Sequence, residues 1–152
     1  PVLTPTIHLK PVSDNVKPGE YLGVEVRVDN FSGLNGALFD LRYTSPMMEF
    51  IRISRGMFFI EENKLLQWNE GTVQVYPGLI SGIGGKRNTS SANGNLLATL
   101  YFKLGTRPGE GTISLENIQL TSEQKLPAYK VEGIRIKITE KGEVKIESFE
   151  EK

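Results

Sequence analysis

The sequence contains no cysteine, one tryptophan and a single histidine, His8, among its 152 residues. Without cysteine the chain forms no disulfide and no thiolate metal site, and a cysteine nucleophile is excluded. His8 has no second histidine with which to form a metal-binding pair, and no serine stands in the strand-turn-helix context of a hydrolase nucleophile. A calcium-loop pattern is missing as well. We therefore expect no enzyme activity, no cofactor and no metal site in this chain.

An excess of one charge and a long apolar run are also absent. Lys plus Arg and Asp plus Glu both number 18, so the formal net charge is +0. Because no basic stretch stands out that would follow a phosphate backbone, we do not expect a nucleic acid partner. No apolar segment approaches the ~20 residues that cross a bilayer, so we do not expect membrane insertion.

Alternation of apolar and polar residues is the clearest positive signal, and residues 24–57 show it best. Apolar side chains occupy every second position in VEVRV at 24–28 and in FDLRY at 39–43. This period is typical of a sheet with one face in a core and the other in water. The predicted inward set is Val24, Val26, Val28, Phe39, Leu41 and Tyr43. The predicted outward set lies around Leu38 and Asp40.

Similar segments follow one another along the chain, and no convincing helical period interrupts them. The predicted strands cover residues 6–12, 21–30, 37–44, 48–54, 65–69, 72–76, 95–104, 111–120 and 130–139. With 16 Gly and 8 Pro available for turns, this pattern predicts a nine-stranded β-sandwich. A chain of this length is expected to form one domain.

Three segments are predicted to lie outside these strands. Ser45 and Pro46 fit the cap and the first position of one short helical turn. Residues 82–95, GIGGKRNTSSANGN, form a connection long enough to be mobile or functional. Residues 140–152 are charge-rich, and we interpret them as a linker, or at most an added edge strand, following a module of residues 1–139.

Several motifs occur in an order that resembles a cohesin module over residues 6–139. They are KPGE at 17–20, the loop at 30–36, RYTSP at 42–46, the strand and glycine at 48–56, GNLLATLYF at 94–102, ISLENIQL at 113–120 and VEGIRIKI at 131–138. Cohesins usually carry an Asp after the tyrosine of the third motif, whereas this chain has Thr44 followed by Ser45. The chain is therefore similar to a divergent cohesin.

The resemblance implies a nine-stranded jelly-roll sandwich, one flat face of which binds a dockerin, a helical module that carries its own calcium. It implies a non-catalytic docking role in a cellulosome-like scaffold, outside the cell or at its surface. The positions implied for partner binding are Gly36, Leu38, Asp40, Tyr76, Leu79 and Gly82, with Gln124 and Leu126 aligned more loosely. Because Leu38, Tyr76, Leu79 and Ile80 are apolar, we expect an apolar patch at this face. The alternative is that Leu38 and Ile80 face a loop or another strand.

Two other functions remain open, because jelly-roll sandwiches serve several purposes. One is carbohydrate binding by a row of exposed aromatic rings. Its candidate members are Trp68, Tyr76, Tyr101 and Tyr129, and polysaccharide is the less favoured partner. The other is a structural sandwich domain of a surface or secreted protein.

Overall fold

The computed structural model describes residues 4–61, 64–65, 68–87 and 95–151. In these ranges the chain forms strands and one short 3-10 turn, η1 (Met57–Phe59). The strands are β1 (Thr6–Pro11), β2 (Tyr21–Asp29), β3 (Leu34–Tyr43), β4 (Met48–Arg55), β5 (Ile60–Glu61), β6 (Lys64–Leu65), β7 (Trp68–Gln74), β8 (Leu79–Lys86), β9 (Leu96–Leu104), β10 (Gly109–Ser122), β11 (Lys130–Ile138) and β12 (Val144–Glu151). Within the described ranges, no helix has the length and apolar character needed to span a bilayer.

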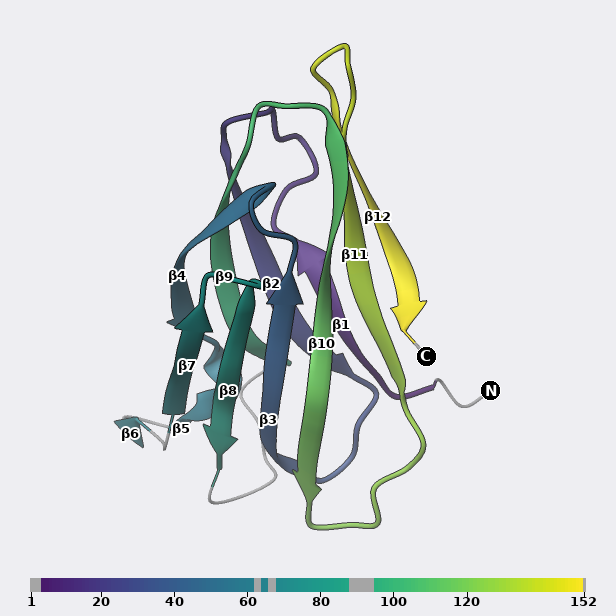
Figure 1. Cartoon of the computed structure of the whole chain (residues 1–152). Coiled ribbons are helices and arrows are strands. Elements are labelled where there is room, and N and C mark those ends of the chain that lie inside the picture. Colours follow the sequence, from purple (N-terminus) through teal and green to yellow (C-terminus); the bar gives the residue numbers. More distant parts are fainter. Residues whose placement is uncertain (1–3, 62–63, 66–67, 88–94, 152) are drawn as a thin grey trace.

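Nine strands are hydrogen-bonded one after another in the order β4-β9-β2-β1-β11-β10-β3-β8-β7, and β12 is added beside β11. The sheet curls into two layers (Figure 1). One layer contains β4, β9, β2 and β1, and the other contains β10, β3, β8 and β7. The predicted nine-stranded jelly-roll sandwich is therefore confirmed, although two of the expected strands differ from those observed.

Strand β11 joins the two layers because its two halves pair with different neighbours. Its first residues pair in parallel with β1, so that Ile7 lies opposite Val131. Its later residues pair antiparallel with β10, where Ile113 lies opposite Ile134. Gly133 stands at the change of partner, and a Cβ on it would lie 2.7 Å from the carbonyl oxygen of Ile113. Only a residue without a side chain permits this close approach.

The space between the layers is filled by the inward side chains of the alternating strands. Every member of the predicted inward set is buried, and Val24, Val26, Phe39 and Leu41 have no exposed surface. The later strands contribute Leu100, Phe102, Ile134 and Ile136 to the same core. Phe102 packs against the rings of Tyr43 and Phe50, with centroids 5.3 and 5.7 Å apart. The prediction of the buried face is confirmed.

The predicted loop at 82–95 is wrong over its first residues, because Gly82 to Lys86 belong to β8. Ile80 and Ile83 of β8 are both buried although three positions separate them. A β-bulge opposite Asp40, between the pairs Leu41–Ile80 and Phe39–Ile83, makes this possible by shifting the alternation by one residue. Glycines and the bulge together hide the period-two pattern. Of the rest of the predicted loop, Arg87 and Asn95 flank residues 88–94, which lie outside the described residues.

Residues 45–47 form a brief turn with no helix, so the predicted turn is present but is not helical, and the Ser45–Pro46 peptide bond is cis. Thr44 braces this turn with its side chain. Its Oγ1 accepts the Thr112 N–H at 3.0 Å, which ties the end of β3 to β10. A hydroxyl therefore holds the turn at the position where the resemblance leads one to expect a carboxylate.

The charged segment at 140–152 contains β12, which pairs antiparallel with β11 from Val131–Glu151 to Ile138–Val144. Of the two interpretations of this segment, the added edge strand agrees with the structure over residues 144–151. Phe149 lies on Gly133, and Arg135 is placed over its ring at 5.2 Å from the centroid. The C-terminal strand thus covers the place where β11 changes layers.

Candidate functional site

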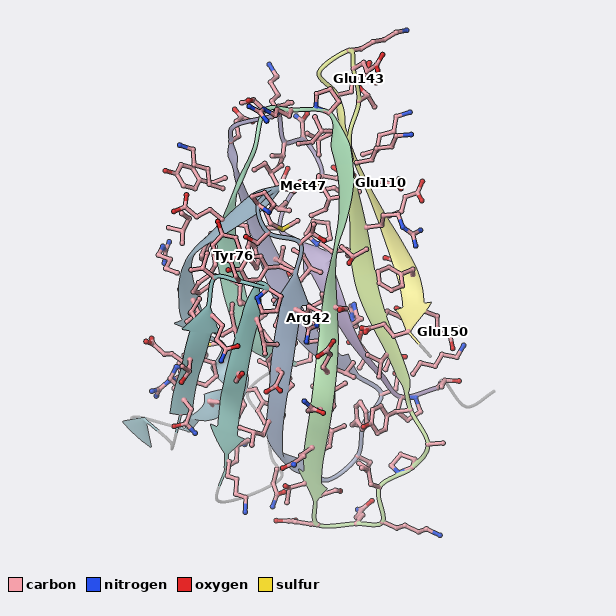
Figure 2. The ribbon with its side chains drawn as sticks, viewed as in Figure 1. Arg42, Met47, Tyr76, Glu110, Glu143 and Glu150 are labelled. Carbon is pink, nitrogen blue, oxygen red and sulfur yellow. The ribbon has the colours of Figure 1, made fainter. Side chains whose placement is uncertain are left out.

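Most of the predicted binding positions lie on the outward face of the layer formed by β10, β3, β8 and β7. Alternation places Leu38, Asp40 and Arg42 of β3 on this face, opposite the buried Phe39 and Leu41. Gly36 lies near the start of β3, and Leu79 and Gly82 lie on the neighbouring β8. Tyr76 lies in the turn between β7 and β8. We call this outward surface of the four strands the β3 face; Figure 2 labels Arg42 on it and Tyr76 at its end.

Gln124 and Leu126 lie elsewhere, in the segment that follows β10. Gln124 is exposed and lies beside Gly33, which precedes β3. Leu126 is half-buried and packs against the core. The structure therefore brings six of the eight predicted positions together and separates these two from the β3 face.

The expected apolar patch is only partly present. Ile80 has no exposed surface, because its side chain belongs to the core. Leu38 and Leu79 are half-buried on the β3 face, whereas Tyr76 is 79% exposed in its turn. Val75 is exposed beside Tyr76, whereas the exposed Val73 lies opposite Ile80, on the inner side of the edge strand β7. Exposed apolar surface is thus concentrated at the β7–β8 end of the face, and Ile80 is no part of it.

Two shallow depressions mark the β3 face where glycines leave side chains out. One of about 250 Å³ is lined by Leu38, Asn69, Gly85, Lys86, Gln119 and Thr121, together with Ala37. A more open one of about 430 Å³ adjoins it and is lined by residues of β7 and β8, among them Gly71, Ser81 and Gly82. Asn69 borders both. The face therefore offers two adjoining recesses for side chains of a partner.

An ion pair occupies the middle of the face. Arg42 donates from Nε to Glu116 Oε2 at 2.7 Å and from Nη2 to Glu116 Oε1 at 3.2 Å. This bidentate contact raises the pKa of the Arg42 guanidinium. Glu116 lies directly opposite Asp40 on the neighbouring strand, and Arg42 offsets the repulsion between the two carboxylates.

Asp40 itself bridges the strands on either side of β3. Its Oδ1 accepts the Gly82 N–H at 2.9 Å, and its Oδ2 accepts a hydrogen bond from Asn117 Nδ2 at 2.8 Å. Asn117 has a φ of 49° and lies at an irregularity of β10 between Glu116 and Gln119. Sequence reasoning did not find Glu116 or Asn117. The outward parity of Glu116 in ISLENIQL was the available signal, but the irregularity after it hides the position of Asn117.

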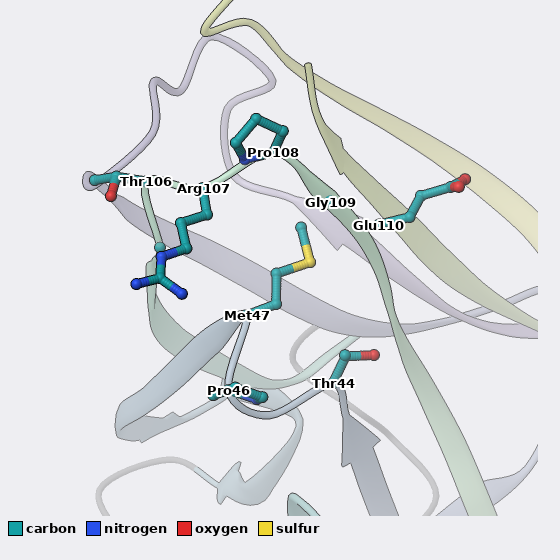
Figure 3. Close-up of a pocket in the computed structure, with 9 residues that line it drawn as sticks. Thr44, Pro46, Met47, Thr106, Arg107, Pro108, Gly109 and Glu110 are labelled. Atoms are coloured by element: carbon teal, nitrogen blue, oxygen red, sulfur yellow. The ribbon is translucent and has the colours of Figure 1, made fainter. Parts of the chain in front are cut away.

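An apolar hollow at one end of the sandwich lies away from this face. It has a volume of about 520 Å³ and lies between the β3–β4 turn and the β9–β10 connection. Figure 3 shows Met47 directed into it, with Pro46 and Thr44 on one side and Arg107 and Pro108 on the other. It brings together no group of titratable side chains suited to catalysis.

The single histidine and the buried Tyr43 are engaged in structural contacts. His8 Nε2 lies 2.5 Å from Asp29 Oδ2 on the outer surface of the other layer, and Asn95 donates to the same carboxylate. Burial raises the pKa of the Tyr43 hydroxyl, and Glu49 adds to the effect. In the described part of the chain, no three His, Cys, Asp or Glu side chains are placed to hold a metal ion.

The aromatic residues considered for sugar binding are dispersed. Trp68 packs on Phe59 at 5.1 Å, Tyr129 packs on Phe31 at 5.8 Å, and Arg52 stacks over Tyr101 at 4.1 Å. They lie on β7, on the segment before β11 and on β9, respectively. Of the four, Tyr76 is exposed, whereas Trp68, Tyr101 and Tyr129 are half-buried.

No protein-family model and no curated protein sequence matches the chain. Solved cohesin structures do match it. The second type II cohesin of the adaptor scaffoldin ScaA from Acetivibrio cellulolyticus aligns with a TM-score of 0.69 and 12% identity, covering 86% of this chain and 94% of that one. A type I cohesin, OlpA, in complex with a dockerin from Clostridium thermocellum aligns with a TM-score of 0.64 and 16% identity, covering 85% and 94%.

A non-cellulosomal cohesin from the archaeon Archaeoglobus fulgidus aligns as well, with a TM-score of 0.60, 16% identity and coverage of 85% and 87%. The alignments extend over nearly the whole of each cohesin, and their identities are low enough that the likeness concerns the fold. In its architecture, this chain is a cohesin-like β-sandwich.

Proposed function

We propose that the chain is a non-catalytic docking module that binds a dockerin-type partner through the β3 face. The partner carries its own calcium, and the module acts outside the cell or at its surface as part of a scaffold. The contact positions proposed are Leu38, Tyr76 and Leu79, the small residues Gly36 and Gly82, and Asp40, with Gln124 and Leu126 as more distant candidates.

The observation that carries this proposal is the likeness of fold to cohesins that were solved in complex with dockerins. The β3 face supports it in physical terms. Its two recesses have room for projecting side chains of a partner, and the exposed ring of Tyr76 can pack against that partner. The ion pair and the amide groups at its centre can form hydrogen bonds. Apolar anchors combined with polar groups that form hydrogen bonds are typical of protein interfaces.

The proposal is tested by calorimetric titration of the chain with dockerins that carry paired calcium loops, in calcium and in chelator. We expect binding only in calcium, because the dockerin folds around the ion. The double variant Leu38→Asp with Tyr76→Ala should weaken binding at least about a hundredfold, since it puts a charge in one recess and removes the exposed ring. Its melting temperature should stay near that of the wild type.

The matched control is Val12→Asp with Tyr21→Ala, on the opposite layer. Val12 is 57% exposed and Tyr21 is 61% exposed, and the control makes the same two kinds of change, an apolar side chain to Asp and Tyr to Ala. This variant should bind as the wild type does. Equal binding by both double variants would show that the β3 face is not the docking surface.

The same samples distinguish the two other functions. Retention of the wild type on insoluble polysaccharide, without dockerin binding, would favour a carbohydrate-binding module. The variant Tyr76→Ala would then test whether the exposed ring of Tyr76 binds the sugar. Absence of both activities would favour a structural sandwich. The dispersed positions of Trp68, Tyr101 and Tyr129 give the sugar-binding function no continuous platform.

A further inference from the structure

The β3 face is built around two irregularities that lie on opposite sides of the same strand. On one side, β8 has a bulge at Ser81 and Gly82 opposite Asp40. On the other, β10 is irregular at Asn117 and Ile118, between the residues that pair with Asp40 and Leu38. Gly82 and Asn117 both have a positive φ, of 77° and 49°. Bulges of this kind bend strands and redirect side chains.

Asp40 is bonded to both irregularities at once. Its two oxygens are directed sideways along the sheet, one to the Gly82 N–H and the other to the Asn117 amide. The bulge leaves the Gly82 N–H without a ladder partner on β3, so the carboxylate satisfies a donor that the sheet cannot. Hydrogen bonds to an ionised group are the stronger kind.

The positions held in this way border the recesses of the face. Gly82 lines the more open depression, and Gln119, which follows the irregularity of β10, lines the one over Leu38. A change in either bulge would therefore alter the recess beside it.

We propose that Asp40 is a positioning residue of the docking face, whose carboxylate ties the bulges of β8 and β10 together and sets the shape of both recesses. Asp40 acts through Gly82 and Asn117, and this positioning role replaces the direct contact proposed above for Asp40. This inference rests on the proposed docking function. It assigns Asp40 a role different from that of Leu38 and Tyr76.

The test compares three variants by dockerin titration and by amide hydrogen exchange measured with NMR. Asp40→Ala removes both bonds and should speed exchange of the Gly82 amide and weaken dockerin binding, each by about tenfold. Asp40→Asn keeps an oxygen for the Gly82 N–H, and rotation of the Asn117 amide restores the second bond. Both readouts should then stay within about threefold of the wild type.

Asn117→Gly removes the second bond alone, and glycine tolerates the positive φ at this position. Its dockerin affinity should fall between those of Asp40→Asn and Asp40→Ala. Glu147→Ala, which removes an exposed carboxylate from β12, controls for the loss of charge. The amide of Leu100 in β9 reports on global opening, so that a change confined to Gly82 is recognised as local.

Several results would overturn the inference. Binding by Asp40→Asn as weak as that by Asp40→Ala, with the Gly82 amide still protected, would mean that the partner contacts the charge directly. Unchanged affinity in Asp40→Ala would remove the positioning role. If the wild type bound no dockerin, the docking function would fail, and Gly82 protection would then decide separately whether Asp40 holds the bulges.

Discussion

Individual glycines determine how closely the strands of the β3 face approach one another. Gly84 of β8 has a φ of 134°, and a Cβ on it would lie 2.0 Å from the carbonyl oxygen of Ala37. Both the backbone conformation and the space require glycine there. This approach also sets the position of Leu38 in its recess, because Leu38 pairs directly with Gly84.

Gly84→Ala is therefore expected to lower the free energy of unfolding by roughly 3 kcal/mol, from strain and from displacement of β3. Gly109→Ala is the matched control, because a Cβ at Gly109 meets nothing within 4 Å. It should leave stability almost unchanged. Urea denaturation measures both, and equal stability of the two variants would show that the approach of β8 to β3 is not tight.

Glu151 gives the protein a pH dependence. Burial raises the pKa of its carboxyl above the ordinary 4.5, Glu116 adds to this, and the hydrogen bond from the Leu115 N–H opposes it. A folded-state pKa above the unfolded value means that stability falls as pH rises from about the unfolded value through the folded one. Above that window the penalty is constant.

Glu151→Gln should remove this loss, because the neutral amide keeps an oxygen for the Leu115 N–H and carries no charge. We expect the variant to be more stable than the wild type at neutral pH and to show a flatter stability profile through the titration window. Thermal melts across that range measure the difference. A wild type that gains stability relative to the variant as pH rises would contradict the direction of the shift.

At the level of elements, alternation predicted the strands that keep a regular period and failed where the period breaks. The inward residues of β2, β3, β9 and β11 could be read directly from the sequence. Strand β8 could not, since its bulge moves Ile83 out of phase with Ile80 and its glycines give no apolar signal. Strand β12 was only an alternative, because its charged residues resemble a linker as much as an edge strand.

The same reason limited the prediction of the site. Leu38 and Asp40 followed from the outward parity of β3, whereas the partners of Asp40 lie at irregularities that no period predicts. Gln124 and Leu126 were aligned through a loop, where no alternation determines which way a side chain faces. The orientation of Leu126 is instead decided by packing against the core.

Strand β12 can be tested as an element by ending the chain after Thr139, at the predicted boundary of the module. The nine strands of the main path pair without β12, so the shortened chain should fold and should bind dockerin with unchanged affinity. Its melting temperature should fall, since Phe149 no longer covers Gly133. Loss of folding would show that residues 140–151 are an integral part of the domain.

At the scale of the whole molecule, the two layers present different outer surfaces. The β3 face has recesses and an ion pair at its centre. The surface of the other layer carries a row of hydrogen bonds in which Arg27 binds Glu25 and Asn95, and Asn95 in turn binds Asp29. One shared core supports both surfaces, so destabilising core variants should weaken docking only through the amount of folded protein.

The path of β11 and β12 has a mechanical consequence. Strand β1 runs parallel to β11, and β12 then returns, so that Thr6 and Glu151 lie beside Lys130 and Val131 at one end of β11 (Figure 1). Tension between Thr6 and Ile138 would shear the parallel pair and load its hydrogen bonds together. Tension between Thr6 and Glu151 instead peels strands apart one bond at a time. In single-molecule pulling, the chain that ends at Thr139 should therefore resist a higher force than the complete chain, although it melts at a lower temperature.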